Sequence, residues 1–143
     1  MRKPMLRLMR LVSVLFLLFF FQVNCSIFKP KMDPVGLQYA VSIQQEALEV
    51  VAKASESFSL HREEVYRLMT RVERAYEHAR PLYKNGGVTG IWDVMRDPLS
   101  NRLARFMAEW EKEDILDESY IKSALKWVKD DFDILIKIEE KKK

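Results

Sequence analysis

The feature that most constrains the fold is a long stretch without helix breakers. Between Gly36 and Pro81 the chain contains neither glycine nor proline. Stepping through residues 37–83 by four and three reaches fourteen positions, of which eleven are apolar. Apolar residues at this spacing form one stripe along a helix, whereas a half-buried strand alternates apolar and polar residues. The stretch therefore predicts helix, and the rest of the sequence offers no strand candidate.

A serine cluster interrupts this stripe. Ser55, Ser57 and Ser59 carry hydroxyl groups that compete for backbone hydrogen bonds and favour caps and turns. We therefore expect two helices, over residues 34–54 and 60–83, with Ser59 capping the second. One unbroken helix is the alternative, because the apolar stripe keeps its phase through the cluster.

Asp-Pro pairs and glycines mark further boundaries. Asp33-Pro34 and Asp97-Pro98 are helix-start signals, because Asp caps the first turn and Pro lacks an N–H group that would be unpaired there. Three of the four glycines lie within residues 86–90, so residues 84–96 are expected to form an irregular connection on the core. Further helices are expected from Asp97 and from near Asp117. Their predicted apolar faces are Leu99, Leu103, Phe106 and Trp110, and Ile121, Leu125, Val128, Phe132 and Leu135. The sequence thus predicts an all-α bundle of three to four helices with one irregular Gly-containing connection.

The N-terminal residues have the pattern of an export signal. Four basic residues within the first ten precede a largely apolar run over residues 11–21. Eleven residues fit a signal-peptide core of about 7–15 and fall short of the roughly 20 that span a membrane as a helix. We expect a signal peptide over residues 1–24, an anchor and spacer over 25–33, and the bundle over 34–143. A retained, uncleaved anchor is the alternative.

Cys25, the single cysteine of the chain, follows the apolar run by four residues. With Gln22-Val23-Asn24 before it and Ser26 after it, Cys25 resembles the acylated cysteine of the bacterial lipoprotein signal. Gln22 and Asn24 depart from the preferred Leu and the preferred small residue. The resemblance implies lipidation of Cys25 and an outer-membrane anchor facing the periplasm. The short spacer after Cys25 would then bring Lys29 and Lys31 close to anionic lipid, and a merely solvated linker is the alternative. Ordinary cleavage to a soluble secreted protein remains the alternative.

Charge and motifs exclude several classes of function. The net charge of +3 becomes −1 without the four cations of the leader, so the basic field that nucleic-acid binding requires is missing. Catalytic motifs and metal-ligand spacing are also missing, so we expect no enzyme activity, no metal and no cofactor. His61 and His78 fall about 100° apart around a helix and are expected to be solvated. Favourable i, i+4 ion pairs are expected for Glu63 with Arg67 and Asp133 with Lys137.

A second apolar row on the last predicted helix suggests a binding surface. It consists of Tyr120, Trp127, Ile134 and Ile138. A helix with two apolar rows is either deeply buried or covered by a partner. Trp92 is a further candidate, because it lies in the Gly-containing connection where binding residues collect. These residues suggest a module that binds an envelope protein of unknown identity. A carrier of a small ligand or lipid, with the aromatic residues around a cavity, is the alternative, and an enzyme acting on cell-wall polymers ranks third.

Overall fold

The computed structural model describes residues 33–82 and 86–141. Within these ranges every regular element is a helix, which confirms the all-α prediction. The structure has five helices where the sequence predicted three to four. They are α2 (Pro34–Ala52), α3 (Phe58–Leu82), α4 (Gly87–Arg96), α5 (Leu103–Glu113) and α6 (Glu118–Glu140).

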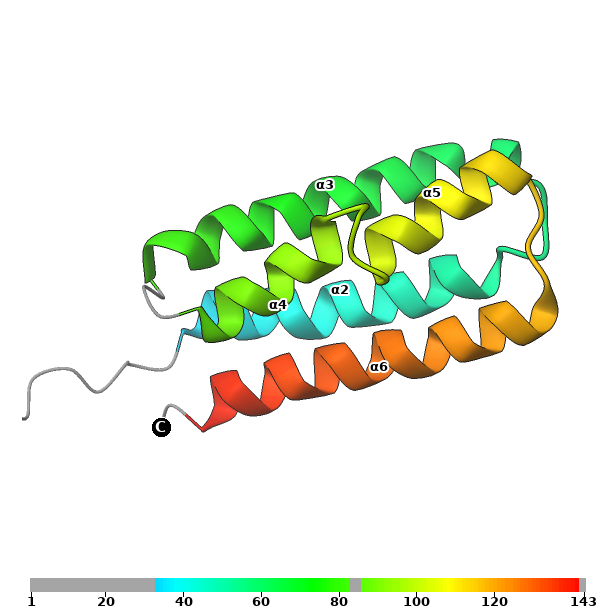
Figure 1. Cartoon of the computed structure of the whole chain (residues 1–143). Coiled ribbons are helices and arrows are strands. Elements are labelled where there is room, and N and C mark those ends of the chain that lie inside the picture. The colour runs from blue at the N-terminus through cyan, green and yellow to red at the C-terminus, as the bar shows by residue number, and fades with distance from the viewer. Residues whose placement is uncertain (1–32, 83–85, 142–143) are drawn as a thin grey trace, which may run out of the picture. The chain divides into compact units, whose positions relative to one another are not determined.

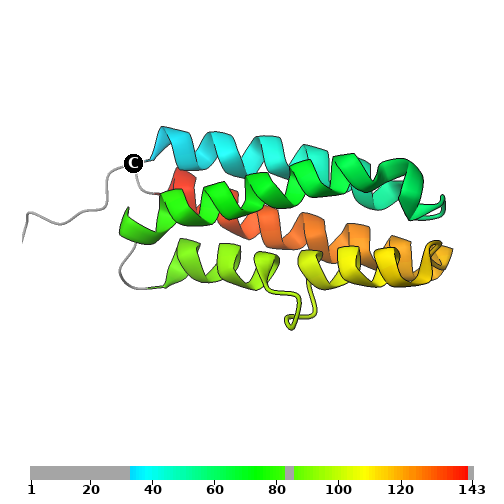
Figure 2. The same ribbon diagram turned by 90° about the horizontal axis from the view of Figure 1, so that it is seen from above.

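The five helices form a four-helix-type bundle in which two short helices together take the place of the fourth helix. The long helices α2, α3 and α6 lie side by side, and α4 and α5 follow each other in line to fill the fourth position (Figures 1 and 2). Helix α2 packs on α3 and α6, and α4 and α5 pack on the same two helices from the other side. The structure has more helices than predicted because a loop divides the fourth helix of the bundle into α4 and α5.

The serine cluster separates α2 from α3, as predicted, but the capping residue differs. Helix α3 begins at Phe58, so Ser59 lies inside it and does not cap it. Asp114, from the loop between α5 and α6, takes the capping role: its Oδ1 accepts hydrogen bonds from Phe58 N at 3.1 Å and from Ser57 Oγ at 2.8 Å. The same two loops are joined by Leu116 N donating to Ala54 O at 2.8 Å. A residue 56 positions away in the chain therefore starts α3.

Helix α4 corrects the prediction of an irregular connection over residues 84–96. Gly86, in the left-handed region at φ 83°, precedes the helix, and Gly87 and Gly90 lie within it. Burial explains why a helix forms despite these glycines. Val88, Trp92 and Met95 lie on one face at helical spacing and are buried in the core.

The second Asp-Pro pair does not start a helix, which is a further correction. Asp97 follows α4 and organises a turn: its carboxylate accepts hydrogen bonds from Leu99 N at 2.9 Å and Ser100 Oγ at 3.0 Å. Helix α5 begins only at Leu103. Leu99, predicted to be buried, is therefore 89% exposed at this turn.

The other two predicted helix starts are confirmed. Asp33 precedes α2, with Pro34 in its first turn, and its Oδ1 accepts from Val35 N at 3.1 Å. Asp117 caps α6 by accepting from Ser119 N at 2.8 Å and Tyr120 N at 3.3 Å. Both carboxylates satisfy amide groups that have no partner within the helix.

Aromatic rings fill the centre of the bundle. Trp92 of α4 meets Phe132 of α6 edge to face with ring centroids 5.7 Å apart, and Phe58 meets Trp110 in the same way at 5.5 Å. Trp110 Nε1 donates to Glu56 O at 3.0 Å and Asp114 O at 3.1 Å, so its one polar group is paired. These contacts join α3, α4, α5 and α6 around one core.

The predicted signal peptide, Cys25, Lys29 and Lys31 lie outside the described residues. In the part of the chain that is described, none of the helices is both long and apolar enough to cross a membrane. Export, lipidation and the envelope location stay predictions.

Candidate interaction surface

The first half of the second apolar row of α6 packs on α5. Tyr120 and Trp127 both contact Phe106 of α5, with ring centroids 5.4 Å and 6.3 Å away. Tyr120, Trp127 and Ile138 are half-buried against the core, whereas Ile134 is 51% exposed. The row therefore serves partly as packing between α5 and α6 and leaves Ile134 accessible.

Trp92 does not belong to this surface. Its side chain is 1% exposed and lies between α4 and the other helices, in contact with Phe132. The candidate binding role of Trp92 is thus wrong, because the segment that carries it is a buried helix and not a loop.

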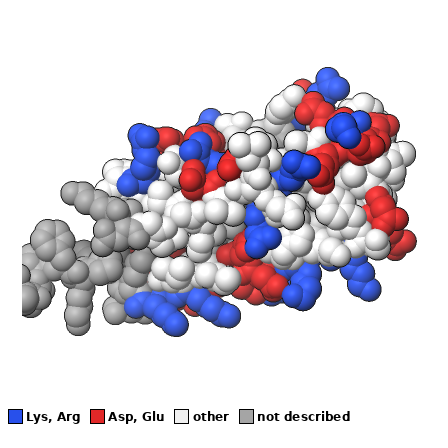
Figure 3. Space-filling view, in the orientation of Figure 1, with Lys and Arg blue, Asp and Glu red and all other residues white. Residues whose placement is uncertain are grey.

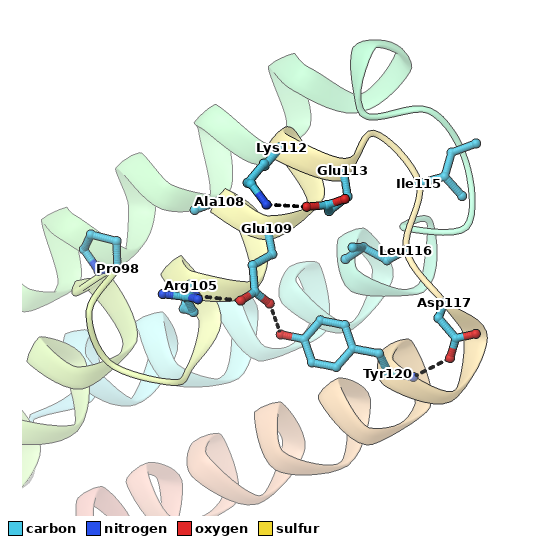
Figure 4. Close-up of a pocket in the computed structure, with 10 residues that line it drawn as sticks. All are labelled: Pro98, Arg105, Ala108, Glu109, Lys112, Glu113, Ile115, Leu116, Asp117 and Tyr120. Atoms are coloured by element: carbon cyan, nitrogen blue, oxygen red, sulfur yellow. Dashed lines mark hydrogen bonds and ion pairs between the residues drawn. The ribbon is translucent and has the colours of Figure 1, made fainter.

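Hydrogen bonds through Arg105, Glu109 and Tyr120 join α5 to α6 (Figure 4). Arg105 Nε donates to Glu109 Oε1 at 2.6 Å, and Tyr120 Oη donates to Glu109 Oε2 at 2.5 Å. The hydrogen bond from Tyr120, followed by that from Arg105, lowers the pKa of Glu109 below its ordinary value. Burial, followed by the hydrogen bond to Glu109, raises the pKa of Tyr120 to about 12. Glu109 is therefore held as a carboxylate and Tyr120 as a neutral phenol.

An ion pair between Arg102, at the start of α5, and Asp131 of α6 is a second link between these two helices. Arg102 Nε lies 2.9 Å from Asp131 Oδ2, and the Arg102 guanidinium lies 5.8 Å from the centre of the Trp127 ring. Burial raises the pKa of Asp131, while the positive charge of Arg102 opposes that shift. Trp127 is thus held between Phe106 and Arg102.

Three apolar side chains on the segments that form this contact are exposed: one in the turn before α5, one after α5 and one on α6. Leu99 is 89% exposed, Ile115 is 56% exposed and Ile134 is 51% exposed. Pro98 and Ile115 line an open pocket of about 570 Å³ that also contains Arg105, Glu109 and Tyr120 (Figure 4). We call the surface formed by Pro98, Leu99, Ile115, Tyr120, Trp127 and Ile134 the α5–α6 surface. It combines exposed apolar side chains with a charged pocket whose hydrogen bonds are already made.

Leu99 and Ile115 were not identified as surface residues from the sequence. The sequence predicts Leu99 on the buried face of a helix, because Asp97-Pro98 matches a helix start. The signal that identifies the turn is Asp97-Pro-Leu-Ser100, in which the Asp side chain bonds to the backbone two residues later.

The two histidines are half-buried, which corrects the expectation that both are solvated. His61 Nε2 lies 2.8 Å from Glu56 Oε2, and the His61 ring lies 5.7 Å from that of Trp110. His78 Nε2 lies 2.8 Å from Asp33 Oδ2, which links the end of α3 to the start of α2. Each imidazole thus pairs with a carboxylate.

Catalytic and metal chemistry find no support in the described ranges. These hold no group of three or more His, Cys, Asp or Glu side chains placed to bind a metal. Among the acidic residues near the end of α5, Asp114 and Asp117 cap helices and Glu109 is bonded to Arg105 and Tyr120. The expectations of no enzyme activity, no metal and no cofactor stay predictions.

The surface charges are mixed in sign. Figure 3 shows Lys and Arg interspersed with Asp and Glu on the face in view. Neither predicted i, i+4 ion pair forms: Asp133 pairs with Lys129 at 2.5 Å and not with Lys137, and Glu63 and Arg67 do not pair. This pattern gives no support to nucleic-acid binding, which needs a field of one sign.

Similarity to known proteins gives no further information on the α5–α6 surface. Comparisons with protein-family models, with curated proteins and with solved structures find no match to this chain. The contacts within the chain itself are the basis for a functional proposal.

Proposed function

We propose that this chain is an exported, lipid-anchored helical protein of a bacterial envelope that binds another envelope protein through the α5–α6 surface. The observation that carries the binding role is the turn after α4. Asp97 accepts two hydrogen bonds within this turn and keeps Leu99 89% exposed. A partner that covers Leu99 removes its apolar area from water, which favours binding.

The surroundings of Leu99 support the same role. Tyr120 and Trp127 offer aromatic rings that are already fixed in place by Phe106, so binding to them orders few side chains. Arg102, Arg105 and Glu109 have ionic partners and surround the apolar residues with polar groups. Aromatic residues with a polar rim are typical of protein–protein interfaces.

The carrier alternative has less support. A carrier would use the aromatic residues to line a cavity between the helices. Trp92, Phe106, Trp110 and Phe132 are fully buried, and Trp92, Phe106 and Trp110 each contact another ring of the bundle. None of these four residues lines the 570 Å³ pocket, and five of its ten lining residues are charged, so it does not suit an apolar ligand.

A pair of substitutions tests the binding role. Affinity-tagged full-length chain is isolated from envelopes as wild type, as the Leu99→Ser/Ile134→Ser variant and as the control Leu60→Ser/Val41→Ser. The control residues are exposed to a similar degree, at 72% and 49%, on α3 and α2. We expect one protein to be co-isolated with the wild type and the control and to be lost with the first variant. Equal co-isolation with all three would contradict the proposal.

The anchor has its own test. Mass spectrometry of the mature protein is expected to find an N-terminal Cys25 carrying diacylglycerol. Cys25→Ser is expected to abolish that mass and to release the protein from the outer membrane. An N-terminus at Ser26, or an intact leader, would rule out the lipid anchor without affecting the α5–α6 surface.

A further inference from the structure

A second pocket lies between α2 and α3, on the side of the bundle opposite the α5–α6 surface. The opposition follows from the packing: α2 contacts α3 and α6, and the α4–α5 pair contacts the same two helices from the other side (Figure 2). The pocket has a volume of about 360 Å³. Its lining residues are Glu46, Glu63, Tyr66, Arg67, Thr70, Arg71 and Arg74.

The three arginines of this pocket follow one another on successive turns of α3. Arg67 and Arg71 are four residues apart, and Arg71 and Arg74 are three apart, so all three lie along one side of the helix. Like charges at these spacings repel one another and weaken a helix. A row of three arginines therefore needs negative charge from elsewhere.

Among these three arginines only the central one forms an ion pair with a described residue, while Glu64 attracts Arg67 from a longer distance. Arg71 forms a short hydrogen bond with Glu46 of α2 and donates to Ser42 Oγ at 2.6 Å. Arg67 and Arg74 are exposed and form no ion pair with any residue that the structure describes. Glu63 also lines the pocket without pairing with Arg67, so cations exceed anions by one around the pocket.

We propose that this pocket binds a phosphate group through Arg67 and Arg74. The planar guanidinium presents paired N–H groups that match phosphate oxygens, and these charge-assisted hydrogen bonds are among the strongest in proteins. Arg71 is held between them by Glu46 and Ser42 and adds a fixed positive charge. The exposed ring of Tyr66 at the same pocket gives the rest of a phosphorylated molecule an apolar face to pack on.

The phosphate can belong to a soluble phosphate ester or to a phospholipid head group, because both present the same oxygens. Thr70 adds no donor, since its hydroxyl already donates to Tyr66 O at 2.8 Å. Recognition thus depends on Arg67 and Arg74. The phosphate site and the α5–α6 surface have no residue in common, so the two proposals are independent of each other.

Phosphate binding is measured on the full-length chain in an uncharged detergent, by titration with phenyl phosphate and with inorganic phosphate. The Arg67→Gln/Arg74→Gln variant is compared with Arg62→Gln/Arg80→Gln, which removes the same charge from the same helix outside the pocket. We expect saturable phosphate binding by the wild type, weakened roughly tenfold or more in the pocket variant and by less than about twofold in the control. The pocket variant should melt at the wild-type temperature or above it, since it relieves repulsion along α3.

Vesicles distinguish the two sources of phosphate. Phosphatidylcholine vesicles with and without phosphatidylglycerol are mixed with each variant. Binding that increases with phosphatidylglycerol and falls in the pocket variant assigns the site to a lipid head group. Saturation by phenyl phosphate without that increase assigns it to a soluble ester. Absence of saturable binding by the wild type in both assays, or equal losses in the pocket variant and the control, would overturn the proposal.

Discussion

Gly36 lies where α2 begins, at a point with no room for a side chain. A Cβ atom at this position would lie 2.6 Å from Asp33 Oδ2. Asp33 caps α2 through its other oxygen and pairs with His78 of α3 through this one. The glycine is therefore required by the close approach of the Asp33 carboxylate.

Gly36→Ala is expected to lower the free energy of unfolding by about 1–3 kcal/mol, because the new methyl group displaces Asp33 from Val35 and His78. Gly90 in α4 is the matched control, since a Cβ there would meet no atom within 4 Å. Gly90→Ala should raise the stability by about 0.5–1 kcal/mol. Urea denaturation measures both changes, and two changes of the same sign would contradict this account of Gly36.

Glu109 gives the α5–α6 seam a defined response to acid. Its pKa is lowered from 4.5 by the hydrogen bonds from Tyr120 and Arg105, so the folded state binds this proton less readily than the unfolded state. The stabilisation is fully present above pH 4.5 and is lost as the pH falls through the lowered pKa of the folded state. Protonation removes the negative charge that strengthens the hydrogen bonds from Tyr120 and Arg105.

The free energy of unfolding of the wild type should therefore fall more steeply below pH 4.5 than that of Glu109→Gln. Tyr120→Phe should show an intermediate slope, because it removes the hydrogen bond with the largest effect on Glu109 and keeps that from Arg105. Denaturant titrations at a series of pH values measure the slopes. Parallel curves for all three proteins would show that Glu109 is not stabilised as a carboxylate.

At the scale of the elements, the start of α3 depends on a loop that is distant in sequence. Asp114 has φ 64° and ψ −39°, a positive-φ conformation that few non-glycine residues adopt. Its side chain accepts from Ser57 and Phe58, and its backbone oxygen accepts from Phe58 N at 2.9 Å and Trp110 Nε1 at 3.1 Å. Asp114 therefore ties α3 and α5 together at one end of the bundle.

Asp114→Ala is expected to cost about 1–2 kcal/mol, since it removes the capping carboxylate and places a Cβ-bearing residue without a compensating bond at positive φ. Asp114→Asn keeps an Oδ1 acceptor and a side chain of the same shape, so its stability should stay within a few tenths of a kcal/mol of the wild-type value. Thermal unfolding followed by circular dichroism compares the two. Equal losses would mean that the negative charge, and not the hydrogen bonds, is what matters at this position.

The helix boundaries that the sequence predicted are those with a local cause. Asp33 and Asp117 cap the helices that follow them directly, and both starts were predicted. The cap of α3 was missed because Asp114 is brought to Phe58 by tertiary packing. Helix α4 was missed because its glycines favour a loop locally, while the burial of Trp92 among other helices outweighs that preference.

At the scale of the whole molecule, the bundle could be predicted and the details of its core only in part. On α3 the predicted stripe includes the buried Val65 and Val72. On α2 the stripe includes the buried Val51 but also Val41, which is 49% exposed, and it misses the buried Ala40, Ile43, Ala47 and Val50. Helix α2 lies between α3 and α6, and small alanines let these neighbours approach, a preference that a search for large apolar residues does not detect.

The candidate surface, like the core, could be predicted from the sequence only in part. The row on α6 could be found from spacing alone, because Tyr120, Trp127 and Ile134 recur every seven residues. Its direction toward α5 and the exposure of Leu99 depend on where the broken fourth position of the bundle places α5. Periodicity within one helix carries no information on that placement.

The central claim is that the α5–α6 surface is where another protein binds, and photo-crosslinking at single positions tests it most directly. A photoreactive amino acid replaces Leu99, Ile134 or, as the control, Leu60 in the full-length chain, and intact cells are irradiated. We expect crosslinks to one and the same protein from positions 99 and 134 and none to it from position 60. Crosslinks to that protein from position 60 alone, or no crosslink from 99 and 134, would contradict the claim.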